Sequence, residues 1–424
     1  MMKLHVFNPE HDLALAANLA NFTAPHAGRQ LRADLGFLPA IWADDGDVVL
    51  VGNIEDAERC YRRLMRCPFG RFVSKEQLAK LPLTGVDVWG WDKAICSELL
   101  RYGVSRSLMP NELHMIRELS HRSIAMHVLS GLQGDDIVGE AVMAYPHRIP
   151  ELLSKWGKIV VKAPWSSSGR GVRFFDKDLN IQNCGWIENV AKRQGCVMVE
   201  PYYAKVKDFG MEFYYDGEGH ASYLGLSLFQ TLNGAYSGNI LADEEFKMDY
   251  ISRYIPVDLL MCIKDKICKL ASAEFRHFYK GPFGIDMMVV ARDDHSGFLL
   301  HPCVEINLRR TMGHVALSLS NIVSGLPKVM QIEYNSIYKL RLQRLCDLYF
   351  KFVFYHYCRW RFLPSIALRC GHQIMVTEPT PILLSMQTTR TQMSVWAQVG
   401  RTTILRLLLS SVFPVCQYSI RKTL

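Results

Sequence analysis

Three polar side chains occupy alternate positions in the segment from His301 to Gly313, namely Glu305, Asn307 and Arg309. In an extended strand, residues two apart point to the same face, so these three groups would share one site. Carboxylate and amide oxygens are ligands that Mg²⁺ prefers, and a guanidinium group suits phosphate or carboxylate. The pattern therefore predicts a strand that carries a site for phosphoryl chemistry. The same alternation is also typical of the solvent face of an ordinary edge strand.

A second predicted strand, residues 281–291, precedes this segment and carries one acidic residue, Asp286, among apolar neighbours. Turn-forming residues at 292–297 and the strand at 298–307 would complete an antiparallel hairpin. This pairing would bring Asp286 beside Glu305 and Asn307. A buried acid in an apolar strand needs a partner, and a shared cation would be one.

A cluster of basic and small residues lies between 158 and 174. Residues 159–161 form a short apolar strand, Lys162 stands at its end, and a flexible loop follows. The loop comprises Ser166, Ser167, Ser168, Gly169, Arg170 and Gly171. Backbone N–H groups of such a loop approach anions closely, and Lys162 and Arg170 add positive charge. The cluster predicts an anion-binding loop, although a Ser/Gly hairpin turn without function has the same composition. The Gly-Lys-Ser/Thr ending of a Walker loop is missing.

A third apolar strand, residues 197–199, ends at Glu200 and Pro201. A strand that stops at proline leaves backbone groups free, and these can hydrogen-bond the edge of an adenine. Asp208, further along the chain, can reach a ribose hydroxyl. By itself, this segment is better explained as a surface glutamate before an ordinary turn.

Taken in order, these segments resemble the ATP-grasp superfamily over roughly residues 110–320. The resemblance rests on Lys162 with its loop, on Glu200-Pro201, on Gly284-Ile-Asp286 and on Glu305-Ile-Asn307-Leu-Arg309. It implies two α+β lobes that hold ATP between them, with ATP and Mg²⁺ (or Mn²⁺) as cofactors. We therefore expect a small parallel α/β amino-terminal domain followed by a two-lobed ATP-grasp fold.

The resemblance implies a nucleotide-binding role for the residues of the first lobe. Lys162 would contact the α- and β-phosphates, and the 166–171 loop would close over them. Glu200 and its neighbours would bind adenine, and Asp208 the ribose. Members of the superfamily commonly place a phosphate-binding lysine before the first lobe. This chain has Arg122 there, which keeps the charge but not the compact ammonium group.

The resemblance also implies a metal site in the second lobe. Asp286, Glu305 and Asn307 would hold the metal ion. Arg309 would face the γ-phosphate or the carboxylate of an acceptor substrate. Lys162 and Arg309 are therefore the predicted catalytic residues.

The amino-terminal region alternates short apolar strands with helical segments. Predicted strands at 3–7, 47–51 and 86–89 and helices near 55–65 and 93–100 are typical of a small parallel α/β unit. The first strand runs into the polar cluster Asn8-Pro-Glu-His-Asp12, at the strand end where open parallel sheets bind ligands. Helix capping by Asn8 or Asp12 is the simpler explanation, and contact with the acceptor substrate is the functional one.

The 424 residues divide into four predicted parts: an amino-terminal domain (1–109), two lobes (110–200 and 201–334) and a basic tail (335–424). The net charge of +8 belongs to the tail, where twelve Lys or Arg accompany two acids, so the remainder carries −2. The charge therefore says nothing about the predicted catalytic body. The twelve cysteines are scattered without Cys-x-x-Cys or paired Cys/His spacing, which argues against a zinc site or a disulfide framework.

The tail is open to three interpretations. Residues 338–362 mix Arg with aromatic residues around one candidate helix, and residues 377–403 are rich in Thr, Gln, Pro and Ser. The tail is a basic segment for a membrane surface or an anionic partner, a helical cap on the ATP lobe, or sequence translated out of frame.

The resemblance to the ATP-grasp superfamily implies an ADP-forming ligase that joins a carboxylate to an amine or another nucleophile through an acyl phosphate. Two alternatives remain: a phosphotransferase built on the same ATP cradle and a non-catalytic nucleotide-binding protein. The expected partners are small-molecule carboxylate and amine substrates, without nucleic acid. No signal peptide or membrane-spanning stretch is visible, so we expect a cytoplasmic protein. The oligomeric state does not follow from the sequence.

Overall fold

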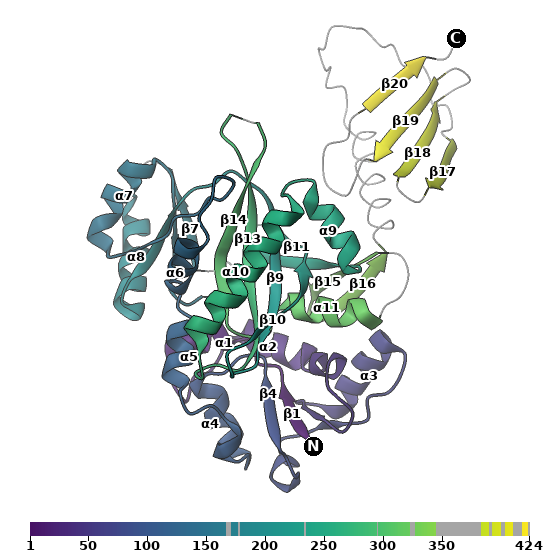
Figure 1. Ribbon diagram of the computed structural model, residues 1–424. Coiled ribbons are helices and arrows are strands. Elements are labelled where there is room, and N and C mark those ends of the chain that lie inside the picture. Colours follow the sequence, from purple (N-terminus) through teal and green to yellow (C-terminus); the bar gives the residue numbers. More distant parts are fainter. Residues whose placement is uncertain are drawn as a thin grey trace. The chain divides into compact units, whose positions relative to one another are not determined.

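The computed structural model of the chain separates into two units, Met1–Leu348 and Tyr349–Leu424 (Figure 1). It describes residues 1–166, 171–176, 179–232, 235–294, 296–322 and 327–344, together with four strands further on. Within these described residues, the first unit holds four sheets of four strands each. The candidate site lies entirely in this unit.

A parallel sheet forms the amino-terminal part of the first unit. Its strands are β1 (Lys3–Val6), β2 (Val48–Leu50), β3 (Phe72–Val73) and β4 (Gly85–Val88), in the order β3-β2-β1-β4. The helices between them are α1 (His11–Ala17), α2 (His26–Leu35), α3 (Ile54–Met65) and α4 (Lys93–Arg101), with 3-10 turns at Leu38–Ile41, Leu78–Lys80 and Arg106–Leu108. Val48 and Leu50 pack into one apolar cluster and Val49 into another. Because both faces are covered, these strands are continuous apolar runs.

The first antiparallel sheet follows, in the order β5-β8-β6-β7. Its strands are β5 (Val142–Ala144), β6 (Ile159–Lys162), β7 (Val172–Phe175) and β8 (Val197–Pro201). Its helices are α5 (Leu113–Leu119), α6 (Ile124–Gly131), α7 (Ile149–Trp156) and α8 (Ile181–Gln194), with a 3-10 turn at Pro146–Arg148. Ile159 and Val161 pack against residues of α7 and α8. Alternation along β6 therefore turns Lys162 to the opposite face.

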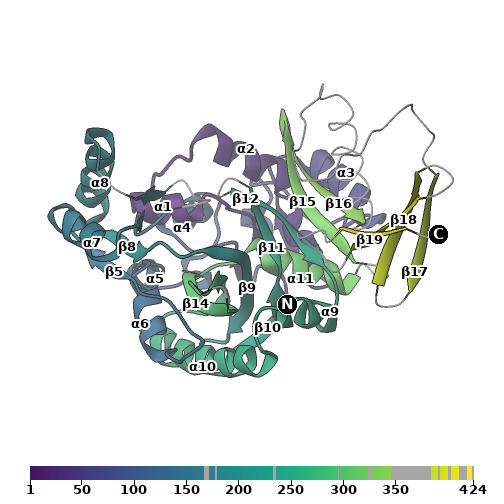
Figure 2. The same cartoon turned by 90° about the horizontal axis from the view of Figure 1, so that it is seen from above.

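The second antiparallel sheet has the order β10-β9-β13-β14. Its strands are β9 (Lys205–Tyr215), β10 (Ala221–Ser227), β13 (Gly281–Ala291) and β14 (Phe298–Asn307). Helix α10 (Val257–Phe275) runs along one face of this sheet, where Phe275 contacts Tyr215 and Phe283 (Figure 2). The opposite face is left for the candidate site.

A third antiparallel sheet, in the order β11-β12-β15-β16, completes the first unit. Its strands are β11 (Phe229–Leu232), β12 (Ala235–Leu241), β15 (Lys328–Asn335) and β16 (Ile337–Arg344). Helices α9 (Glu244–Ser252) and α11 (Met312–Ile322) accompany it in sequence. Buried residues of β12, α11 and β15 join the apolar cluster of the amino-terminal part.

The predicted fold class is confirmed, because a parallel α/β sheet precedes mixed α and β parts with antiparallel sheets. The predicted hairpin is present, with Asp286 opposite Glu305. The helix predicted from residue 338 was wrong where the structure describes it, since residues 337–344 form β16. Tyr338, Leu340 and Leu342 pack toward the core at every second position, which is the period of a strand.

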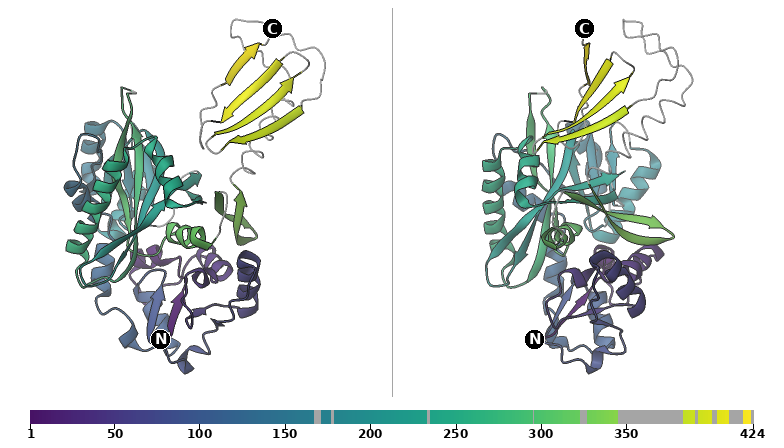
Figure 3. Two further views of the ribbon diagram at one scale, coloured as in Figure 1. Left: turned by 45° about the vertical axis from the view of Figure 1, so that its right-hand side comes forward. Right: turned by 90° about the vertical axis from the view of Figure 1, so that its right-hand side faces the viewer.

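The second unit contributes four antiparallel strands, in the order β17-β18-β19-β20 (Figure 3). They are β17 (Leu383–Thr389), β18 (Gln392–Val399), β19 (Thr403–Leu409) and β20 (Tyr418–Lys422). The predicted start of the tail at residue 335 lies at the turn between β15 and β16, inside the first unit. In the part of the chain that the structure describes, no helix is long and apolar enough to cross a membrane.

Candidate functional site

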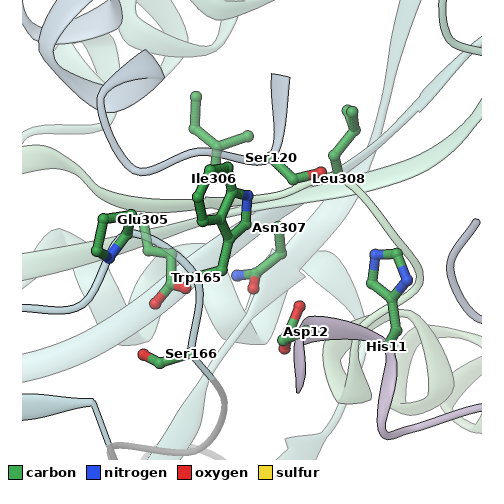
Figure 4. Close-up of a pocket in the computed structure, with 10 residues that line it drawn as sticks. His11, Asp12, Ser120, Trp165, Ser166, Glu305, Ile306, Asn307 and Leu308 are labelled. Carbon is green, nitrogen blue, oxygen red and sulfur yellow. The ribbon is translucent and has the colours of Figure 1, made fainter. Parts of the chain in front are cut away.

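A small pocket lies at the carboxyl end of β14. Four segments far apart in the chain line it: the start of α1, the residue after α5, the segment after β6 and the end of β14. The lining residues are His11, Asp12, Ser120, Pro164, Trp165, Ser166, Glu305, Ile306, Asn307 and Leu308. Figure 4 shows the polar ends of Asp12, Ser166, Glu305 and Asn307 around one space. Two residues of the alternating motif therefore meet the amino-terminal polar cluster here.

The hairpin β13–β14 concentrates acidic side chains on the face that is turned away from α10. Asp286 lies directly opposite Glu305, and Asn307 Nδ2 donates a hydrogen bond to Asp286 Oδ2 at 3.2 Å. Burial, followed by the charges of Glu305 and Glu212, raises the pKa of Asp286 to about 8. Like charges on directly opposed strand positions repel each other, so this face favours a bound proton or a cation.

Arg122 connects this hairpin to the first antiparallel sheet. It is buried between α5 and α6, and its Nη2 donates to Glu305 Oε1 at 2.7 Å. Its Nη1 donates to Ser166 Oγ at 2.7 Å and to the carbonyl oxygen of Ala163. The guanidinium group therefore lies between the predicted phosphate loop and a predicted metal ligand.

Lys162 and Glu200 form a buried ion pair on the first antiparallel sheet. Their strands are neighbours, and Lys162 Nζ lies 2.6 Å from Glu200 Oε1. The same ammonium group donates to the carbonyl oxygen of Val304, in β14, at 3.4 Å. Lys162 therefore faces the strand that carries Glu305.

Arg309 is held by the amino-terminal part of the chain. Its Nε and Nη2 donate to the two carboxylate oxygens of Asp12 at 2.9 and 2.8 Å, and Nη2 also donates to Asn307 Oδ1 at 2.8 Å. Burial opposes ionisation of Asp12, but the charge and hydrogen bonds of Arg309 outweigh it and lower the pKa of that carboxyl. The planar guanidinium group is thus already engaged by a carboxylate, the type of ligand that it suits best.

The capping explanation of the amino-terminal cluster was wrong. Helix α1 has no side-chain hydrogen bond at its start. Asn8 instead donates to the carbonyl oxygen of Gly90 at 2.8 Å, and His11 Nδ1 lies 3.1 Å from Asp92 Oδ2. These contacts orient the start of α1 so that His11 and Asp12 line the pocket.

The remaining predicted nucleotide contacts lie in β9 and in the loop after β6. Asp208 lies in β9 and pairs with Lys205 at 2.6 Å, while Thr231 Oγ1 donates to it at 3.0 Å. A Cβ atom at Gly171 would stand 2.3 Å from the side chain of Ser166, so glycine leaves room for that hydroxyl group. The predicted contacts Ser167, Ser168, Gly169 and Arg170 lie outside the described residues.

Sequence reasoning missed Glu212, a buried carboxylate on the site-facing side of β9. Its Oε2 lies 2.9 Å from His314 Nδ1. Cβ atoms at Gly284 and Gly313 would stand 2.5 and 1.8 Å from its carboxylate oxygens, so both glycines make room for it. The signal was present in the sequence, because Asp208 and Glu212 are four residues apart and share one face of a strand.

No protein-family model matches this chain, and no curated protein matches its sequence. Among solved structures, N5-carboxyaminoimidazole synthetase from Staphylococcus aureus is similar, with 12% identity, a TM-score of 0.44 and coverage of 78% of this chain and 82% of that chain. Carboxyaminoimidazole ribonucleotide synthase from Aspergillus clavatus complexed with ATP has 13% identity and a TM-score of 0.42, over 78% and 81%. The biotin carboxylase domain of 2-oxoglutarate carboxylase from Hydrogenobacter thermophilus has 10% identity and a TM-score of 0.45, over 78% and 74%.

Proposed function

We propose that this chain is an ATP-grasp-type ligase that uses ATP and Mg²⁺ to join a carboxylate to an amine or another nucleophile, with release of ADP. The observation that carries the proposal is the meeting of basic and acidic groups from separate elements at β14, beside the pocket that Glu305 lines. Arg122 and Lys162 reach β14 from the first antiparallel sheet and its helices. Asp286 and Glu305 oppose each other on β13 and β14.

The basic groups on the first sheet are suited to hold polyphosphate. Lys162 and Arg122 are both buried, and both already have acidic or carbonyl partners at the site. A bound triphosphate would replace those partners, because phosphate oxygens accept charge-assisted hydrogen bonds from the same donors. Glu200 and the chain that follows it would bind the base, and Asp208 the ribose.

The acidic groups on the hairpin suit a divalent cation. The carboxylates of Asp286 and Glu305 and the amide oxygen of Asn307 are the predicted ligands. Burial and the charges of Glu305 and Glu212 raise the pKa of Asp286, and a bound cation would favour its ionised form. Mg²⁺ usually binds one or two carboxylates and takes its other ligands from water and phosphate. Within the described residues, no group of three or more His, Cys, Asp or Glu is arranged to hold a metal by itself. When bound, the ion would neutralise the charge that develops on the transferred phosphoryl group.

The proposed reaction has two steps. An oxygen of the substrate carboxylate attacks the γ-phosphorus of ATP, the bond to the bridging oxygen breaks, and ADP leaves. The amine nitrogen then attacks the carbonyl carbon of the acyl phosphate, phosphate leaves and the nitrogen loses a proton. Arg309 would orient the substrate carboxylate, which must replace Asp12 in its guanidinium fork or bind beside it. Catalysis in this scheme depends on positioning and charge neutralisation.

The test is ADP release screened against carboxylates and amino acids, with and without added amines. A ligase requires a carboxylate for ADP release, and hydroxylamine captures the acyl phosphate as a hydroxamate. A phosphotransferase would instead give a stable phosphorylated product without any amine. A nucleotide-binding protein without catalytic activity would bind ATP and release no ADP with any acceptor. Either of the last two results contradicts the proposal.

A further inference from the structure

His301 is a buried histidine whose ring nitrogens lack partners. It lies in β14, and its exposed fraction is 0%. Among the described residues, neither Nδ1 nor Nε2 has a hydrogen-bond partner. An unsatisfied buried polar atom destabilises the fold, so native proteins rarely keep two on one side chain without a reason. Nothing in the proposed phosphate and metal sites uses this ring.

The surroundings of His301 enclose its ring without pairing its nitrogens. The ring of Tyr203 contacts it edge to face at a centroid distance of 5.4 Å. A Cβ atom at Gly139 would stand 3.0 Å from Nε2, so the main chain at this glycine lies against the ring edge. The chain around Gly139 is fixed, since Val138 N donates to the carbonyl oxygen of Leu300 at 2.8 Å and Glu140 N donates to the Tyr203 hydroxyl at 2.9 Å.

The position of His301 along β14 corresponds to the base end of a nucleotide. Glu305 marks the metal end, and Lys162 meets the strand at Val304. On β13 the residues opposite Glu305 and His301 are Asp286 and Met288, which are only two positions apart, so the bulge in β14 places His301 roughly 7 Å from Glu305 along the sheet. Tyr203 belongs to the segment after Glu200 that is proposed to bind the base.

The chemistry of the ring fits an uncharged ligand. Burial and the charge of Lys162 lower the pKa of His301 to about 3, so the imidazole is neutral at physiological pH. A neutral imidazole offers one N–H donor and one lone pair. A purine base offers ring nitrogens as acceptors, and adenine adds an amino group as a donor.

We propose that His301 is a specificity residue that hydrogen-bonds the purine base of the bound nucleotide. The inference rests on the proposed nucleotide site. It goes beyond that proposal, because it assigns base recognition to a side chain of β14 in addition to the backbone after Glu200. The alternative is a structural histidine whose ring nitrogens are satisfied by ordered water.

The experiment compares ATP with inorganic tripolyphosphate, a ligand without a base, by calorimetry in the presence of Mg²⁺. In His301→Phe the ring shape is similar and both polar atoms are gone. We expect the Kd for ATP to rise about tenfold while the Kd for tripolyphosphate stays within about twofold, since one or two hydrogen bonds are lost. His277→Phe, at an exposed site after α10, is the matched control and should change neither value.

Each other result overturns the inference in a distinguishable way. If ATP binds His301→Phe as tightly as it binds the wild type, His301 does not contact the base and the proposed function stands. If ATP and tripolyphosphate weaken together, the side chain supports the phosphate site or the fold. If the wild type binds neither ligand, the proposed function fails and the inference fails with it.

Thermal unfolding without nucleotide separates base recognition from a structural role. Replacement of an unsatisfied polar ring by an apolar one should leave the melting temperature unchanged or raise it. His301→Leu removes the same polar atoms with a smaller side chain. It should give the same result as His301→Phe in the calorimetry and in the thermal unfolding. A clear fall in the melting temperature of both variants would mean that the ring is already satisfied in the folded protein, and would overturn the proposal.

Discussion

The two antiparallel sheets that meet at the pocket arrange their charges differently. On the first sheet, Lys162 and Glu200 form a pair whose side chains are 8% and 10% exposed. On the second sheet, Glu212, Asp286 and Glu305 share one face, and Arg122 reaches Glu305 from a separate helical segment. The pair on the first sheet is therefore neutral in itself, whereas the site-facing side of the second sheet keeps an excess of acid. The protein itself supplies the counter-charge on the first sheet, and a cation would supply it on the second.

The largest effect should come from removing a carboxylate on the second sheet. Glu305→Gln should lower the rate of acceptor-dependent ADP formation roughly a thousandfold, because a metal at this site supplies several kcal/mol of charge stabilisation. The measurement is the initial rate of ADP release at saturating ATP. Glu218→Gln, in the exposed β9–β10 turn, is the control. A Glu305→Gln enzyme with more than a tenth of the parental rate would remove this residue from the metal site.

A change to the Lys162–Glu200 pair on the first sheet should mainly lower the free energy of unfolding. Lys162→Met leaves the Glu200 carboxylate buried without its partner, which should lower the free energy of unfolding by about 3–5 kcal/mol. The double variant Lys162→Met/Glu200→Gln should recover most of this loss, and urea unfolding of both proteins measures it. Lys158→Met, at the exposed approach to β6, should have little effect. Equal stability of the single and double variants would show that Lys162 and Glu200 do not form a buried ion pair.

The excess acid on the second sheet should appear as a pH dependence of stability. The pKa of Asp286 is raised to about 8 in the folded protein, from 3.8 as its ordinary value. Its stabilising contribution is complete below pH 4 and is lost as the pH rises through 8. Between pH 6 and 8, without metal, the wild type should lose about 2 kcal/mol more than Asp286→Asn.

Melting temperatures of wild type and Asp286→Asn across this pH range provide the measurement. Asp265→Asn, an exposed carboxylate on α10, is the control and should follow the wild type. Added Mg²⁺ should oppose the loss in the wild type alone, because the metal binds the ionised carboxylate. Parallel pH profiles for wild type and Asp286→Asn would contradict the acid-rich character of this sheet.

Sequence patterns predicted the parts of the site that depend on local alternation. The β13–β14 hairpin follows from two apolar runs around a turn, and Lys162 stands at the end of β6 because an apolar run ends there. The pairing of Asp286 with Glu305 then follows from the register of the hairpin. Such features are local, so one segment of sequence contains the information that determines them.

The sequence could not predict which groups meet across the fold. Arg122 and Glu305 are 183 residues apart, and Arg309 and Asp12 are 297 apart. These ion pairs depend on how the sheets pack, and no local pattern encodes that. Strand β16 was missed for a different reason, because its aromatic and basic residues obscured a period of two.

The smallest effect should come from the second unit. The residues that line the described pocket, and the charged groups that reach it, lie in Met1–Leu348, and β16 closes the third sheet before that boundary. Removal of residues 349–424 should therefore leave the Kd for ATP and the rate of ADP formation within about twofold, well below the tenfold change that 1.4 kcal/mol produces. Calorimetry and the ADP-release assay on the shortened protein measure both. A loss greater than tenfold in either quantity would show that the second unit supplies a group that the site on the two sheets needs.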